Sequence, residues 1–220
     1  YKLASDTAKG DGEINKVQLN MDDFHFTITG VEKEYDTNVT IGNTATITPG
    51  DHYLDLGGGN HLNFEYTIAA GSIYTSKGTT ASGSEAAAVK DAATGKDVHL
   101  TITITDPDLH DNYEYTFVAN QEYDFTGVGT INPKKVYATV NGPVEKTYDA
   151  TTAVKSGDTT LTGDSLVNIV GKLDGTNETS AVYIDSPTGT GDAANYGIGN
   201  KYVKYTVKID DASAGNYVIY

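Results

Sequence analysis

Alternating apolar and polar residues, the pattern of half-buried β-strands, recur along the whole chain. Clusters of Gly, Asn, Asp and Thr separate the alternating stretches, as turns require. Thr, Val, Ile and Tyr fill most strand positions, which is a composition typical of sheets. The pattern predicts an all-β protein with strands in residues 24–28, 98–104, 113–117, 136–140, 202–209 and 217–220.

Two short segments have helical character. Residues 82–85 resemble a capping box ahead of the Ala-rich residues 86–93. Leu166, Ile169 and Val170 have the i, i+3, i+4 spacing of a helix face. Both segments are too short to change the predicted class.

An internal repeat is the second feature of the pattern. V-E-K-x-Y-D occurs at residues 31–36 and again at 144–149, an offset of 148 − 35 = 113. Residues 98–106 match residues 203–211, where the offset has fallen to 203 − 98 = 105. The smaller offset predicts extra residues in the first copy, and we place this insertion around residues 72–97.

Two dipeptides recur at matching places in both copies. Tyr-Asp lies early in each copy and Asn-Tyr lies late. In turns, an Asp side chain accepts a backbone N–H, Asn tolerates left-handed backbone, and a Tyr ring packs on a sheet edge. We therefore interpret these residues as a structural repeat motif: Tyr35, Asp36, Asn112, Tyr113, Tyr148, Asp149, Asn216 and Tyr217.

The joint between the copies is marked by a third match. Residues 129–136 lead into the second copy as residues 12–17 lead into the first. The predicted domains are residues 1–130 and 131–220, each near the common domain size of about 100 residues. Pro133 stiffens the joint by fixing φ. Both ends of the chain look like cuts through a longer array.

The predicted architecture is two tandem Ig-like β-sandwich domains. Small β-grasp-like sheets are the alternative, because the pattern does not fix the number of strands in each copy.

Charge and composition exclude several partners and chemistries. The net charge is −15 and every basic residue is Lys, which argues against nucleic acid and against anionic lipid. The chain has no Cys, so thiol chemistry and disulfides are excluded. No apolar run reaches about 18 residues, so no membrane insertion is expected.

The motifs K-x-Y-D-G-T-T, a V-x-V-x-I strand, A-G-N-Y and G-x-I-x-P-K resemble the YDG-type repeats of bacterial adhesins and haemagglutinin-like exoproteins. The second copy matches best, through residues 146–152 and 214–217. Ala150 and Thr37 stand where the family has Gly. The resemblance implies a secreted, extracellular protein of the bacterial cell surface with many repeats, and it implies no catalytic activity.

We expect a structural stalk or spacer of such an adhesin, with neighbouring repeats of the same chain as its partners. The alternative is a module that binds a host glycan or protein through the insertion around 72–97, although Tyr74 is the only aromatic residue there. An enzyme is not expected, because the second copy has no His and no G-x-S-x-G elbow occurs.

Metal binding has weak candidates. Asp106, Asp108 and Asp111 share one turn and could hold Ca²⁺, but we expect solvated turn carboxylates and no cofactor. The five histidines lack zinc-ligand spacing, and His99 lies in an alternating strand, where we expect it to face solvent.

By analogy with Gram-positive adhesins and pilins, a Lys–Asn isopeptide bond could join an early strand to a late one. The candidate pairs are Lys33 with Asn112 and Lys146 with Asn216. Burying a lysine is costly unless it is paired, so we expect the unmodified mass, without the loss of about 17 Da per bond.

Overall fold

The computed structural model describes residues 10–69, 72–75, 89–105, 113–115, 120–185 and 201–220. These residues form an all-β protein without an α-helix. The only helical elements among them are three 3₁₀ turns, η1 (Met21–Asp23), η3 (Gly163–Ser165) and η4 (Ala214–Asn216). None of the described segments forms a helix long and apolar enough to cross a bilayer.

The first half of the chain builds a curled seven-stranded sheet. Its order is β4-β3-β2-β9-β7-β5, and β6 pairs with β7. Neighbouring strands are antiparallel except β2 and β9, which run parallel. The strands are β2 (Phe24–Glu34), β3 (Thr46–Gly57), β4 (Asn60–Asn63), β5 (Tyr66–Ile68), β6 (Ile73–Thr75), β7 (Ala93–Ile104) and β9 (Gln121–Asn132).

The second half has shorter strands. They form the sheet β13-β10-β16, with β10 parallel to β16, and the antiparallel pairs β14-β15 and β11-β12. The strands are β10 (Lys134–Val140), β11 (Lys155–Ser156), β12 (Thr159–Thr160), β13 (Val167–Val170), β14 (Ser180–Ile184), β15 (Tyr202–Thr206) and β16 (Tyr217–Ile219).

Strand pairing reproduces the sequence repeat. In the first half, β1 (Val17–Gln18) runs parallel to β8 (Tyr113–Glu114), with Val17 opposite Tyr113. In the second half, Lys134 lies opposite Tyr217 in the same arrangement. In both halves, therefore, the strand that follows the joint segment (β1 or β10) lies beside the strand that begins with the Tyr of the Asn-Tyr dipeptide (β8 or β16).

A second matched pairing locates the extra residues. Tyr74 lies opposite Val98, and Tyr183 lies opposite Val203. The separation is 98 − 74 = 24 residues in the first half and 203 − 183 = 20 in the second. Only half of the offset change, 113 − 105 = 8, therefore falls within the predicted insertion at 72–97. The other half precedes Tyr74.

Two local predictions are wrong. Leu166, Ile169 and Val170 do not form a helical turn, because residues 167–170 are strand β13, in which burial alternates. His99 does not face solvent: it is 3% exposed, and its Nδ1 lies 2.7 Å from Asp124 Oδ1. Tertiary packing decides both cases: β13 buries alternate residues, and β7 is buried on both faces from Lys96 to Leu100.

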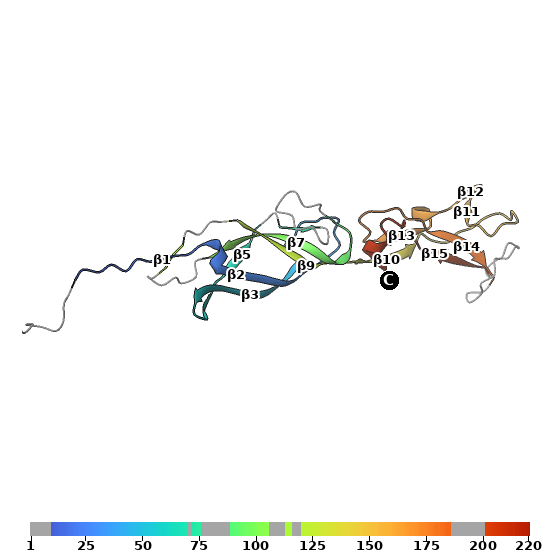
Figure 1. Cartoon of the computed structure of the whole chain (residues 1–220). Helices are drawn as coiled ribbons and strands as arrows, with labels where there is room; N and C mark the ends of the chain where they lie inside the picture. Colours follow the sequence, from blue (N-terminus) through green and yellow to red (C-terminus); the bar gives the residue numbers. More distant parts are fainter. Residues whose placement is uncertain (1–9, 70–71, 76–88, 106–112, 116–119, 186–200) are drawn as a thin grey trace, which may run out of the picture.

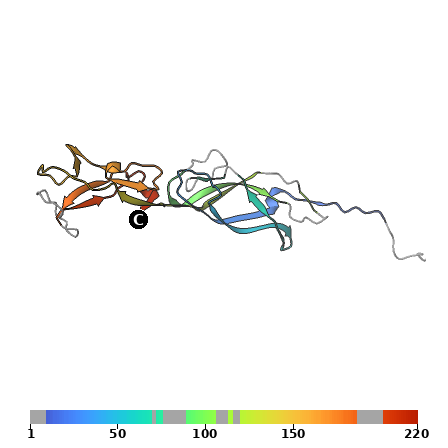
Figure 2. The same cartoon turned by 180° about the vertical axis from the view of Figure 1, so that it is seen from behind.

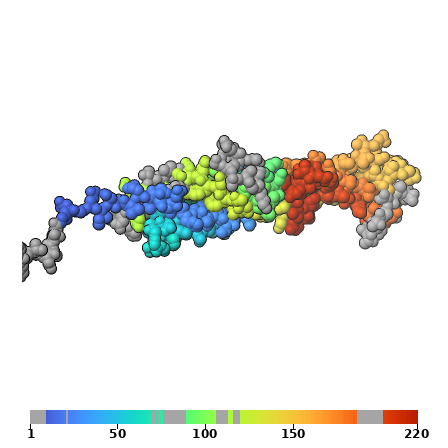
Figure 3. Space-filling view, viewed as in Figure 1, coloured from blue at the N-terminus to red at the C-terminus, as the bar shows by residue number. Residues whose placement is uncertain are grey.

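The two halves lie end to end, and the chain passes from β9 to β10 at Pro133 (Figures 1 and 2). No described strand pairing crosses Pro133. We refer to the described residues before and after it as the first and second repeats. The C-terminus lies beside β10, near the middle of the molecule, and the N-terminal residues project from the opposite end of the first repeat (Figures 1 and 3).

Candidate functional site

The Lys of V-E-K-x-Y-D is bound by its own loop in the first repeat. The Lys33 side chain is 1% exposed. Its Nζ donates to Asp36 Oδ1 at 2.7 Å and to the carbonyl oxygens of Asn38 and Thr40 at 2.7 and 3.0 Å. Three acceptors satisfy the three donors of a buried ammonium, which is the condition for burying one.

The second repeat repeats this arrangement. Lys146 Nζ donates to Asp149 Oδ1 at 2.6 Å and to the Thr151 carbonyl at 2.6 Å. Lys155 binds the other carboxylate oxygen of Asp149 at 2.7 Å. Lys146 first, and then Lys155, hold the pKa of the Asp149 carboxyl well below its usual range.

The same Asp shapes the turn. Asp36 Oδ1 accepts the backbone N–H of Asn38, and Asp149 Oδ1 accepts that of Thr151. The residue after each Asp has left-handed backbone, with φ of 68° at Thr37 and 57° at Ala150. Gly adopts this conformation without strain, which accounts for the Gly that the YDG pattern has there. The Asp of the motif is therefore occupied by its own turn and by Lys.

The Tyr of the motif lies in different surroundings in the two repeats. Tyr35 is fully buried, and Tyr148 is 61% exposed. The Tyr35 hydroxyl donates to Asp174 Oδ2 of the second repeat at 2.7 Å. Its ring packs edge-on against Tyr217, with 5.6 Å between ring centroids. Tyr35 thus belongs to a contact between the repeats.

Asp174 is the centre of this contact, which we call the junction. Lys90 Nζ lies 2.7 Å from Asp174 Oδ2, and the Tyr217 hydroxyl donates to Asp174 Oδ1 at 2.6 Å. Lys90 contributes most to lowering the pKa of Asp174 from 3.8 to about 2. Burial and the neighbouring Asp174 raise the pKa of Tyr35 above its usual value. An ionised Asp174 and protonated tyrosines are thus the stable set near neutral pH.

Asn216 adds a second set of bonds across the junction. Its side-chain amide donates to Asp91 Oδ1 at 3.0 Å and its Oδ1 accepts the Ala92 N–H at 2.7 Å. Nearer the linker, Lys134 lies 2.6 Å from Glu34. Asn216 is buried, so these bonds are shielded from competing water and fix the angle between the repeats.

The junction was only partly visible in the sequence. Asn216 and Tyr217 were singled out because Asn-Tyr recurs, although they were interpreted as a turn within one repeat. Lys90, Asp91 and Asp174 belong to no motif. Their partners in the other repeat are more than 80 residues away in the chain, and no spacing rule reaches that far.

The other candidate residues are placed as follows. Asp106, Asp108, Asp111 and Asn112 lie outside the described residues. Within the described residues, no group of three or more His, Asp or Glu could hold a metal ion. Lys146 and Asn216 have separate partners, the Asp149 loop for one and Asp91 with Ala92 for the other.

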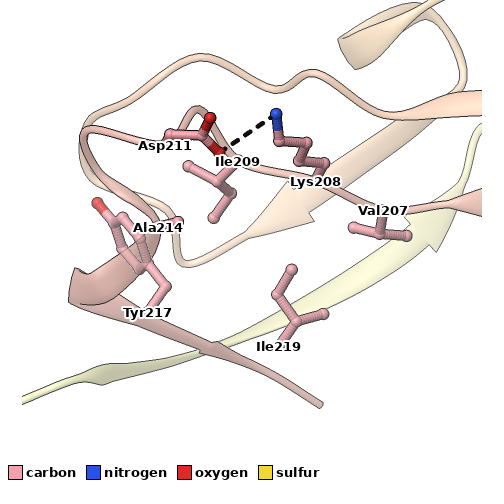
Figure 4. Close-up of a pocket in the computed structure, with 7 residues that line it drawn as sticks. All are labelled: Val207, Lys208, Ile209, Asp211, Ala214, Tyr217 and Ile219. Atoms are coloured by element: carbon pink, nitrogen blue, oxygen red, sulfur yellow. Dashed lines mark ion pairs between the residues drawn. The ribbon is translucent and has the colours of Figure 1, made fainter.

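One shallow pocket of about 200 Å³ lies on the second repeat. It is lined by Val207, Lys208, Ile209, Asp211, Ala214, Tyr217 and Ile219 (Figure 4). Its charged side chains are paired with each other, since Lys208 lies 3.3 Å from Asp211. Ligand sites usually offer polar groups that converge on the occupant and volumes of about 300–1,000 Å³, so this geometry does not favour a small-molecule site.

Comparisons with protein-family models, with curated proteins and with solved structures found no match to this chain.

Proposed function

We propose that this chain is a pair of structural spacer repeats from the stalk of a secreted bacterial cell-surface adhesin, and that it has no catalytic activity. The observation that carries the proposal is the junction. Asp174 of the second repeat binds Lys90 and Tyr35 of the first, and Tyr217 packs on Tyr35. A spacer must keep successive domains in line, and a bonded, partly buried contact does so where a bare linker would leave them free to move.

The end-to-end arrangement supports the same role (Figure 3). The chain enters the first repeat at one end and leaves it at the other, so the second repeat continues the same line (Figures 1 and 3). We further propose that each repeat is an Ig-like β-sandwich, because the strands are mostly antiparallel and those such as β2 and β13 bury alternate residues, as the strands of sandwich sheets do.

The alternative role as a binding module gains little from the predicted insertion. Ser72, Tyr74 and Thr75 are buried within the first repeat. Residues 76–88 lie outside the described residues. The spacer role therefore has the stronger physical support.

Two measurements test the proposal. Small-angle scattering of the intact chain should give the profile of a rigid rod. A Tyr35→Ala, Asp174→Ala double variant should instead give the profile of two flexibly linked domains. A flexible profile for the unaltered chain would remove the support for a spacer. Antibodies against the chain should label intact cells of the organism that produces it, and labelling only after permeabilisation would contradict a surface location.

A further inference from the structure

Two strands that lie far apart in the sequence, β2 and β9, are direct neighbours in the first repeat and run parallel. Their ladder joins residues 31–34 to residues 129–132. The Tyr35 amide adds a hydrogen bond of 2.8 Å to the Asn132 carbonyl. Both strands run toward the linker at Pro133 (Figure 1). The strand that leads into the repeat is therefore bonded directly to the strand that leads out of it.

The parallel arrangement decides how this ladder responds to tension along the chain. Tension draws Phe24, at the start of β2, and Pro133, after the end of β9, away from each other. Because the strands are parallel, β2 is then pulled along β9, and all the paired residues are loaded together. Strands that are pulled apart from one end instead lose their pairs one after another. A ladder loaded in shear therefore withstands a greater force than the same ladder when it is unzipped.

The paired segments are shielded from water. Val31, Lys33 and Ile131 are 0%, 4% and 1% exposed. Gly129 packs so closely on β7 that an added Cβ would lie 2.9 Å from the Lys96 carbonyl oxygen. Hydrogen bonds are stronger in such low-dielectric surroundings, and water does not compete for them. Shielding thus favours a ladder that holds until its bonds break together.

Each strand of the ladder is anchored on its other side. Residues 24–32 of β2 pair with β3, and residues 121–131 of β9 pair with β7. Beyond β2, the Lys33 ammonium holds the next loop through the carbonyl oxygens of Asn38 and Thr40. Neither strand can leave the sheet alone, and no other strand lies between them. The β2–β9 ladder is therefore the shortest bonded path between the two points of tension.

We propose that this ladder, residues 31–35 with residues 129–132, is a mechanical clamp through which the first repeat resists tension along the chain. The clamp ends beside the linker, where Lys134 Nζ lies 2.6 Å from Glu34 Oε1. The clamp is a property of the fold and does not rest on the spacer role. That role would make use of it, because a stalk under tension keeps its length only while its repeats stay folded.

Single-molecule pulling between introduced cysteines tests the clamp, because the chain has no Cys. Asp22→Cys with Pro133→Cys provides exposed handles that load the ladder in shear. Asn38→Cys with Pro133→Cys is the matched control, because both handles lie at the same end of the ladder and unzip it. Residues before 22 and after 133 are outside the force path in both variants.

At one pulling speed, the shear pair should unfold in a single step, at a force at least about twice that of the control. The gain in length should be at most about 400 Å, for 133 − 22 = 111 residues, which identifies the event as unfolding of the first repeat. Equal forces in the two geometries, or a shear pair that opens in several weak steps, would overturn the clamp.

A pair of matched substitutions separates the clamp from general stability. Ile131 lies in the clamp, whereas Ile104 pairs with Tyr66 of β5. Both are buried, so Ile131→Val and Ile104→Val should lower stability to urea by similar amounts. Only Ile131→Val should lower the shear force, and an equal loss of force in both would contradict the clamp. Such a failure would leave the spacer role standing, since that role is tested by the scattering profile.

Discussion

The two repeats share a sequence motif and a loop, but they differ in what covers them. Lys33 and Lys146 are held in the same way by the Asp three residues later. Tyr35 is buried by the second repeat, and Tyr148 is largely exposed. The difference teaches that short-range bonds fix the loop wherever the motif occurs, whereas burial of the motif's Tyr depends on a neighbouring domain. The same residue type at the same motif position can therefore contribute very differently to stability in the two repeats.

The largest expected difference between the repeats lies at these tyrosines. Tyr35→Ala should lower the free energy of unfolding by about 3–5 kcal/mol, because a fully buried ring and its bond to Asp174 are lost. Tyr148→Ala should change it by less than about 0.5 kcal/mol. Urea unfolding of both variants provides the measurement. Equal losses would mean that the junction does not bury Tyr35 in solution.

A smaller difference is expected at the motif lysines. Lys33→Met removes an almost fully buried ammonium and leaves its three acceptors, Asp36 Oδ1 and the carbonyl oxygens of Asn38 and Thr40, without that donor, which should cost about 2–3 kcal/mol. Lys146→Met should cost about 1 kcal/mol, because its side chain is more exposed, at 11% against 1%. Thermal melts at one pH compare the pair, and a greater loss for Lys146→Met would reverse the ranking derived from burial.

Much of this contrast could not be predicted from the sequence. The all-β class was predicted correctly, because alternation is a local signal, and the repeat boundaries were predicted by matching motifs. The junction was not, because Asp174 and Lys90 meet only after both repeats have folded. His99 was misjudged for a related reason: a polar residue in an alternating strand faces solvent unless a partner such as Asp124 satisfies it inside.

Gly129 of β9 and Gly12, which precedes the first copy, provide the next comparison. Gly129→Ala should lower the unfolding free energy by about 1–3 kcal/mol, because the added Cβ meets the Lys96 backbone and Val98. Gly12→Ala should leave the stability unchanged, because a Cβ at Gly12 would have nothing within 4 Å. Chemical denaturation separates the two variants, and a destabilised Gly12→Ala variant would show that Gly12 packs against the rest of the chain.

The smallest expected effect concerns pH at the junction. The folded-state pKa of Asp174, about 2, lies below the ordinary 3.8, so ionisation of Asp174 stabilises the fold. That stabilisation is present above pH 4 and is lost as pH falls toward 2. Asp174 is partly exposed, so solvent screening reduces its contribution to about 1 kcal/mol.

Asp174→Asn should therefore destabilise the chain by about 1 kcal/mol at pH 7 and by almost nothing near pH 2. Asp185→Asn is the control, because it removes an ion pair in which the carboxylate side chain is 67% exposed, and it should shift stability by less than about 0.5 kcal/mol. Unfolding curves between pH 2 and 7 test both variants. If the loss of stability caused by Asp174→Asn did not diminish in acid, it would arise from something other than the lost charge.

Amide hydrogen exchange of the unaltered chain tests the central contrast between the repeats most directly. Residues 31–35 border β9, and the Tyr35 amide donates to the Asn132 carbonyl, whereas the described residues offer 144–148 no backbone hydrogen bond. The amides of 31–35 should exchange at least about 100-fold more slowly than those of 144–148. Equal protection of the two segments would contradict the difference in backbone hydrogen bonding between the repeats.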